Sequence, residues 1–272
     1  MNLFGSVLLH ISLYSLVFNL DLIDETSDGG WSDHSYSRSL YVEEGPCTIV
    51  KKKYNDLSQD EFIKSYASGI GQPIIIQAGS FNKKFQEMCK KCNLIEKYGD
   101  KIIVLSTANS YSYNKAKIKF SEYAEKYVKQ QDSTIEGSST YYWFGDNNHT
   151  EWAELFDMYN QPPYKIPKLT GALSFGVAGA LTGVPFHIHG PTFAETIYGR
   201  KRWFLYPPSA SPQFNPDSTT LLWILESYPK LEEAEKPLEC TLKPGEILFI
   251  PDRWWHATLN LDNAVFISTF MG

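Results

Sequence analysis

The stretch VPFHIHGPTFAETIYGRKRWFLYPP (residues 184–208), with KPGEILFIPDRWWHATLNL (residues 243–261) after it, decides the fold. His187 and His189 lie two residues apart in an apolar, strand-like run, so both side chains are expected on one face of a strand. His256 belongs to a distant strand-like run that begins after a Pro-Gly turn. Three neutral imidazoles on one face of a metal ion leave its other positions open. The sequence therefore predicts a metal site formed by these three histidines inside a barrel.

Short runs rich in β-branched and aromatic residues fill the chain from about residue 170 onward, separated by Gly, Pro and Asn. Many short strands with this punctuation are typical of a sandwich or barrel. Before that point, helical and strand-like patterns alternate. The sequence predicts one mainly β domain with flanking helices over residues 26–272, with an α/β part at about 40–165 and a β core at about 170–272. Helices are expected at residues 58–67, 82–98, 117–130 and 217–228.

The two stretches, in this order and at this spacing, resemble the JmjC (jumonji) family of double-stranded β-helix oxygenases that use iron(II) and 2-oxoglutarate. The resemblance covers about residues 40–272 and is closest to the small JmjC-only branch. That branch includes protein hydroxylases and a member assigned to the lumen of the endoplasmic reticulum. The resemblance implies a jelly-roll, cupin-like fold with His187 and His256 as iron ligands. It also implies that Lys201 pairs with the distal carboxylate of 2-oxoglutarate.

Two positions depart from the family pattern. His189 stands where the family has Asp or Glu, and Val184 stands where related hydroxylases often have a Thr that bonds the co-substrate. A third neutral ligand leaves the site one charge unit more positive, which favours a bound dianion and disfavours oxidation of the metal. Glu195 has a parity that would point it inward, either as a substitute ligand or as a hydrogen-bond partner of the ligands. Asp252 is expected in a turn that faces solvent.

Two classes of function stay open. The first is an iron(II)- and 2-oxoglutarate-dependent hydroxylase of a protein substrate. The second is a non-catalytic scaffold or regulator that acts through protein contacts, including a homo-oligomer, and His189 with Val184 favours it modestly. Lys201 argues against a three-histidine dioxygenase that does not use 2-oxoglutarate. The net charge of −6 gives no support to nucleic-acid binding, and a histone demethylase is the least favoured reading.

The N-terminal segment indicates a route into the secretory pathway. Residues 3–20 carry no charge, and an acidic, Gly-containing stretch follows them. This pattern predicts a signal peptide within residues 1–25, with an uncleaved anchor and a buried core element as alternatives. No other stretch approaches the roughly 20 apolar residues of a spanning helix. The pattern indicates the secretory pathway, and the family resemblance implies the lumen of the endoplasmic reticulum as the location.

Two further features favour the same location. Asn148-His149-Thr150 is an acceptor sequon in a polar, loop-like stretch, which predicts a glycan on Asn148. The four cysteines form an even set, which suits disulfides in an oxidising lumen. Structural disulfides or free core thiols are expected in preference to a redox pair or a zinc site. The cysteines are Cys47, Cys89, Cys92 and Cys240.

Overall fold

The computed structural model of the 272-residue chain describes residues 28–32 and 43–272. The signal peptide or anchor expected at residues 1–25 lies outside the described residues. Within the described part of the chain, no helix is long and apolar enough to cross a membrane.

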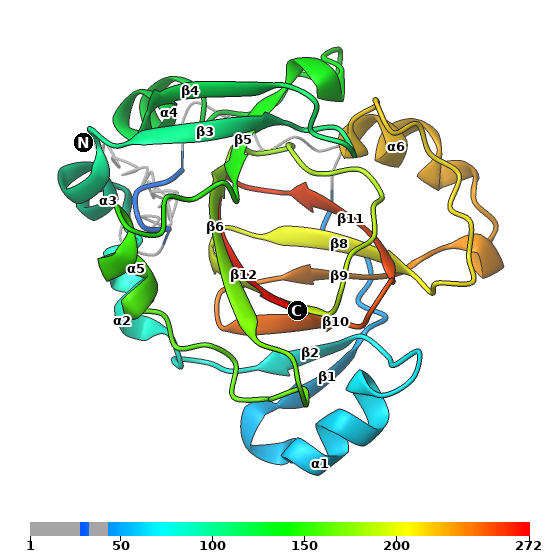
Figure 1. Cartoon of the computed structure of the whole chain (residues 1–272). Helices are drawn as coiled ribbons and strands as arrows, with labels where there is room; N and C mark the ends of the chain where they lie inside the picture. The colour runs from blue at the N-terminus through cyan, green and yellow to red at the C-terminus, as the bar shows by residue number, and fades with distance from the viewer. Residues whose placement is uncertain (1–27, 33–42) are drawn as a thin grey trace, which may run out of the picture.

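Two β-sheets form the body of the protein (Figure 1). The larger has nine strands in the order β1-β2-β10-β7-β12-β6-β5-β3-β4, and the smaller has the order β11-β8-β9. Helices surround these sheets, so the predicted mainly β fold with flanking helices is confirmed. The strands are β1 Val50–Lys53, β2 Ile74–Gln77, β3 Ile102–Thr107, β4 Lys115–Lys119, β5 Tyr141–Phe144, β6 Gly171–Ala178, β7 Thr192–Tyr198, β8 Lys201–Tyr206, β9 Leu238–Leu242, β10 Glu246–Ile250, β11 Trp255–Asn260 and β12 Ala264–Met271.

The two sheets share an apolar core. Trp203 and Leu205 of β8 and Cys240 of β9 pack in one buried cluster with Ala194 of β7 and Leu248 of β10. Trp203 and Leu205 lie on the same face of β8 because side chains alternate between the two faces of a strand. The cluster fills only part of the space between the sheets, and the cavity described below occupies another part.

A disulfide closes the seam between the two sheets. Cys47, just before the edge strand β1, is bonded to Cys240 of the edge strand β9. Beside it, the Thr48 amide donates to the Glu239 carbonyl at 2.8 Å, and the Glu239 amide donates to Thr48 Oγ1 at 2.9 Å. The sequence left open structural disulfides and free thiols, and the described chain contains both. The free thiols are Cys89, which is buried, and Cys92, which is exposed.

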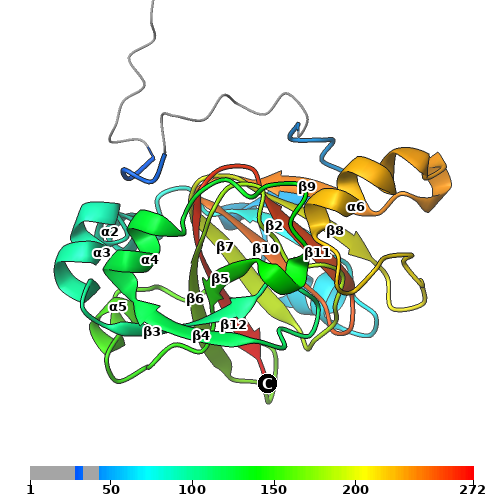
Figure 2. The same ribbon diagram turned by 90° about the horizontal axis from the view of Figure 1, so that it is seen from above.

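The helices lie on separate sides of the sheets. Figure 2 shows α2 to α5 grouped on one side and α6 on the opposite side. An aromatic cluster joins the first group to the large sheet, where Trp152 stacks on Tyr98 at 4.3 Å and packs against Trp143 of β5 at 4.8 Å. The helices are α1 Gln59–Glu61, which continues as a wider helical turn through Phe62–Ala67, α2 Lys83–Met88, α3 Lys91–Tyr98, α4 Phe120–Lys126, α5 Ala153–Asp157 and α6 Thr220–Glu226.

Two helix predictions need correction. The helix expected over residues 82–98 is interrupted at Lys90, whose ψ of 140° is not helical, so α2 and α3 are separate. The helix expected over residues 117–130 begins only at Phe120. The residues before it form β4, which pairs with β3. Lysines alternate with Ala116 and Ile118 there, which is a strand pattern with one buried face.

Candidate metal centre

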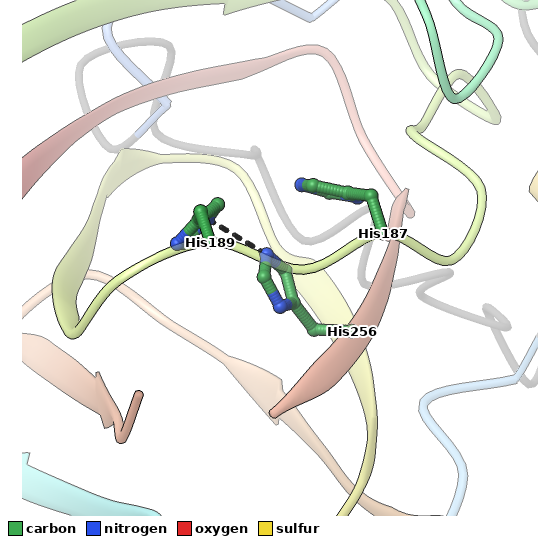
Figure 3. Close-up of side chains that lie close together, drawn as sticks. All are labelled: His187, His189 and His256. Atoms are coloured by element: carbon green, nitrogen blue, oxygen red, sulfur yellow. Dashed lines mark hydrogen bonds between the residues drawn. The ribbon is translucent and has the colours of Figure 1, made fainter. Parts of the chain in front are cut away.

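The three predicted histidines come together between β11 and the segment that precedes β7 (Figure 3). The amide of His187 donates to the carbonyl of His256 at 3.1 Å, and the amide of His256 donates back at 3.0 Å. Nε2 of His189 lies 2.8 Å from Nε2 of His256. One nitrogen from each of the three rings lies within 4.8 Å of the other two. The three rings thus converge on one small volume.

Each of the three rings is oriented by a backbone carbonyl. Nδ1 lies 2.9 Å from the Pro185 carbonyl in His187, 2.8 Å from the Gly190 carbonyl in His189, and 2.9 Å from the Trp254 carbonyl in His256. A carbonyl only accepts, so Nδ1 must carry the proton and Nε2 carries the lone pair. Three Nε2 lone pairs therefore face the same volume.

These features fit a divalent metal ion. Burial lowers the pKa of His187 to about 4 and also lowers the pKa values of His189 and His256, so all three rings are neutral at pH 7. Two neutral nitrogens 2.8 Å apart that both present lone pairs repel each other, and a shared cation removes that repulsion. Carbonyl-oriented histidines with free Nε2 atoms are the usual form of histidine ligands. His187, His189 and His256 can therefore hold the ion.

The segment that carries His187 lies alongside β11 but is not a regular strand. This corrects the strand expected at residues 184–189. Pro185 has no N–H to donate, and the pairing is sparse. Over residues 184–189, the pairing with β11 consists of the bonds between His187 and His256 and of a bond from the Thr258 amide to the Val184 carbonyl at 3.0 Å. Gly183 permits this close approach, because a Cβ there would lie 1.7 Å from the Thr258 carbonyl oxygen.

A cavity of about 140 Å³ extends from the histidines into the space between the sheets. Phe144, Phe266 and Phe270 form an aromatic wall beside His189, and the Phe270 ring contacts the His189 ring edge-on at 4.9 Å. Val184 also lines the cavity, and its side chain offers no hydrogen-bond donor. The cavity therefore has an aromatic wall beside His189, while hydroxyl side chains such as those of Tyr142, Thr258 and Ser268 line other parts of it.

Lys201 lines the same cavity and is the one cation there within the described chain. Its side chain is buried, with Nζ 2.9 Å from Oδ1 of Asn260 and 3.9 Å from the centre of the Phe266 ring. No ion pair joins it to an acidic residue anywhere in residues 28–32 and 43–272. Burial lowers the pKa of Lys201 to about 7. An anion bound beside this side chain would stabilise its protonated form.

Glu195 does not point toward the metal centre, so the inward orientation predicted for it was wrong. Its carboxylate accepts hydrogen bonds from Asn82 at 2.8 Å and from Tyr159 at 2.9 Å, on the other face of β7. The parity count failed because Gly190 and Pro191 form a turn between His189 and β7. Burial raises the pKa of Glu195 to about 7. The other acidic candidate, Asp252, is exposed and lies beside Arg253, in the solvent-facing position that the sequence predicts.

Asn260 and Thr182 support Lys201, and neither was selected from the sequence. Asn260 lies four residues after His256 on β11, so alternation places both side chains on the cavity face. That even spacing was a usable signal. Thr182 carried no such signal, because it lies in an irregular segment and reaches Asn260 only through the tertiary fold, at 3.0 Å.

Asn148 lies far from this site in the chain, in the exposed turn before α5. Its Oδ1 accepts hydrogen bonds from the amides of Thr150 and Glu151, both at 3.2 Å. The side chain is exposed, as a glycosylation acceptor requires.

Two packed β-sheets with three converging histidines between them define a cupin-like metal-site fold. The chain matches the family described as Cupin-like domain over residues 33–270, and it belongs to that family in its JmjC form. It is 50% identical over 252 residues to JmjC domain-containing protein 8 of Mus musculus, a match that covers 92% of each chain. The predicted JmjC family and double-stranded β-helix are therefore confirmed.

Two further similarities are more distant. The chain is 24% identical over 276 residues to the 2-oxoglutarate and iron-dependent oxygenase JMJD4 of Gallus gallus, which covers 92% of this chain and 60% of that one. A ribosomal oxygenase from Escherichia coli, solved with cobalt and succinic acid, aligns with a TM-score of 0.44 at 16% identity, over 79% of this chain and 51% of that chain. Neither similarity identifies a substrate for this chain.

Proposed function

We propose that this protein binds iron(II) and 2-oxoglutarate and hydroxylates a side chain of a protein in the lumen of the endoplasmic reticulum. One observation carries the proposal. The cavity that receives three histidine Nε2 atoms also contains a buried lysine without an acidic partner in the described chain. A cation site and an anion site in one cavity fit a metal ion with an anionic co-substrate, as in the relative named for iron and 2-oxoglutarate.

The residues have separate tasks in this function. His187, His189 and His256 hold the metal through Nε2, and the Lys201 ammonium holds the distal carboxylate of 2-oxoglutarate. Iron(II) with 2-oxoglutarate supplies the oxidising chemistry when both are bound. The aromatic wall of the cavity limits the access of water and strengthens the pairing of Lys201 with the anion.

The rim of the cavity supports a protein substrate. Tyr111 and Tyr113 are more than 60% exposed and stack on each other at 5.4 Å. Ser112 between them has a φ of +47°, and Ser112 and Ser110 line the cavity. The Ser110 hydroxyl donates to the Phe186 carbonyl at 3.0 Å, which fixes the loop next to His187. Exposed aromatic side chains held in place at a cavity mouth are typical of surfaces that bind polypeptides.

The first test is an anaerobic titration of the purified protein with iron(II) and then 2-oxoglutarate, followed by visible absorption. Wild type should develop a charge-transfer band, and His187→Ala and His256→Ala should not. Lys201→Ala should bind iron but need at least tenfold more 2-oxoglutarate for the band. Lys117→Ala, which removes an exposed lysine from β4, is the control and should match wild type.

A second function has its own supporting observations. The family resemblance implies a carboxylate ligand where this chain has His189 and a donor where it has Val184, so this chain lacks two groups of the expected pattern. These differences favour a non-catalytic scaffold that acts through protein contacts, either with other proteins or as a homo-oligomer. Metal uptake without any 2-oxoglutarate band would reject the hydroxylase and select this function.

The lumenal location has a separate test. The exposed side chain of Asn148 and the Cys47–Cys240 disulfide both support an oxidising, glycosylating compartment. The protein from cells should therefore shift to lower mass when treated with an endoglycosidase, and Asn148→Gln should remove the shift. An unshifted wild-type band would count against the lumen.

A further inference from the structure

A chain of hydrogen bonds leads from Lys201 away from the cavity. Nζ of Lys201 donates to Oδ1 of Asn260 at 2.9 Å, and Nδ2 of Asn260 donates to Oγ1 of Thr182 at 3.0 Å. The Thr182 hydroxyl then donates to the carbonyl of Gly179 at 2.6 Å. Lys201, Asn260 and Thr182 are all buried, so solvent does not replace these partners.

The donor and acceptor types fix the direction of every bond. An ammonium only donates, so Lys201 must face the oxygen of the Asn260 amide. The Asn260 nitrogen then faces Thr182, whose single proton is directed to the Gly179 carbonyl. Turning the amide over would place two donors against each other at Lys201. The Asn260 side chain therefore has one orientation, and this orientation locates the ammonium.

Asn260 places the lysine without neutralising it. The lysine ammonium has three N–H donors, and Asn260 is the one hydrogen-bond acceptor it contacts within the described residues. The other donors remain for a ligand. A carboxylate at position 260 would form a buried ion pair with Lys201 and would compete with an incoming anion. Lys201 is the one cation among the described residues that line the cavity, so the attraction of an anion depends on the placement of its ammonium.

We propose that Asn260, oriented by Thr182, is a positioning residue of the anion site, which holds the Lys201 ammonium in the cavity and leaves its charge for a carboxylate. The proposal rests on the proposed function, because it takes 2-oxoglutarate as the ligand. It adds two residues, neither of which touches the metal site, to the machinery of this pocket. It also predicts that an uncharged residue is required at position 260.

The main test is calorimetric titration of manganese-loaded protein with 2-oxoglutarate under anaerobic conditions. Asn260→Asp changes one atom type and should weaken 2-oxoglutarate binding at least tenfold, because Asp pairs with Lys201. Thr182→Val should weaken it about threefold. Both variants should bind manganese like wild type. Thr220→Val is the matched control, because the Thr220 hydroxyl is buried in α6 without a partner in the described chain.

A second measurement does not depend on 2-oxoglutarate. The pKa of Lys201, followed by NMR of labelled lysine, should rise in Asn260→Asp and fall further in Asn260→Leu, with circular dichroism confirming that both variants fold. A purely structural role would not produce shifts of opposite sign. If wild type binds no 2-oxoglutarate but these shifts occur, the co-substrate is wrong and the positioning role stands. Unchanged 2-oxoglutarate affinity in Asn260→Asp, or shifts of the same sign in both variants, would overturn the positioning role.

Discussion

Lys201 and Arg202 are neighbours on β8, and both are buried, yet the chain treats their charges in opposite ways. Arg202 faces away from the cavity, where its guanidinium binds the Glu239 carboxylate, with Nε at 2.9 Å, and also donates to the Glu43 carbonyl at 3.0 Å. Lys201 faces the cavity, where its partner in the described chain is the neutral side chain of Asn260. One strand thus carries a paired charge on one face and an unpaired charge on the other.

The difference separates structure from function. A buried charge without a counter-ion costs stability, so a chain selected only for folding would pair it or replace it. Arg202 has its counter-ion and closes the contact between β8, β9 and the segment that carries Cys47. Lys201 has no acidic partner in the described chain and lies in the same cavity as three histidines. The stability lost at Lys201 is therefore the strongest sign within the described chain that this pocket takes an anion.

The largest effect on stability is expected from breaking the buried ion pair between Arg202 and Glu239. Arg202→Met removes the partner of Glu239 and leaves a carboxylate that is buried and has lost its cation. Removing one member of a buried pair costs about 3–5 kcal/mol, so the midpoint of urea unfolding should fall sharply. Arg200→Met is the control. Arg200 is partly exposed and pairs with Asp262 and Glu44, so its loss should cost about 1 kcal/mol or less. Equal losses for the two variants would contradict the assignment of Arg202 as the structural cation.

The sequence could reveal the residues of the candidate site, but not which side chains pair with Lys201 and Arg202. His187, His189 and His256 were identified from their spacing within two stretches, which is local information, and Lys201 from the family resemblance of the first stretch. The partners of Lys201 and Arg202 could not be identified in this way. Glu239 meets Arg202 through the register of two strands, which no count along the chain can supply.

The same limit explains the residues that were missed or misplaced. The disulfide joins cysteines 193 residues apart, so spacing alone could not select it among the pairings. Glu195 was assigned to the wrong face because its parity was counted from His189 across the turn at Gly190. Parity is reliable only within an unbroken strand, as from His256 to Asn260 on β11. The family resemblance points to the candidate ligands, whereas the residues that orient them can be identified only from the fold.

A smaller effect on stability is expected at Lys201, which has no acidic partner in the described chain. The pKa of Lys201 is about 7 in the folded protein and about 10.4 in an unfolded chain, so the unfolded chain binds more protons between these values. The stability of the metal-free protein should therefore rise with pH above 7. Lys201→Met should remove about 2 kcal/mol of this rise between pH 7 and 9. Lys117→Met, on the exposed face of β4, should keep it.

Urea unfolding at several pH values measures this effect as the difference in stability between wild type and variant. The difference cancels the tyrosines and other lysines that also titrate in this range. Saturating 2-oxoglutarate with manganese should flatten the wild-type profile, because the anion holds the ammonium charged. A difference that does not change with pH would show that Lys201 is already compensated in the metal-free protein.

The opposite pH dependence is expected at Glu195, a buried residue on the far face of β7 whose partners are neutral donors. Its pKa is about 7 in the folded protein and about 4.3 in an unfolded chain, so the folded protein binds more protons between these values. Its contribution to stability is present below pH 4.3 and is lost as the pH rises through 7, which is the opposite slope to that of Lys201. Glu195→Gln should be about 3 kcal/mol more stable than wild type at pH 8 and close to it at pH 4.

Glu195→Gln should also leave the binding of manganese and 2-oxoglutarate unchanged, because the Glu195 carboxylate hydrogen-bonds to Asn82 and Tyr159 rather than to the histidines. Stability from urea unfolding and affinity from calorimetry can be measured on the same preparation. A loss of metal affinity in Glu195→Gln would mean that the carboxylate turns into the cavity when the ion binds. It would then supply the negative charge that His189 does not, and Lys201 would no longer be the one ionised residue that defines the pocket.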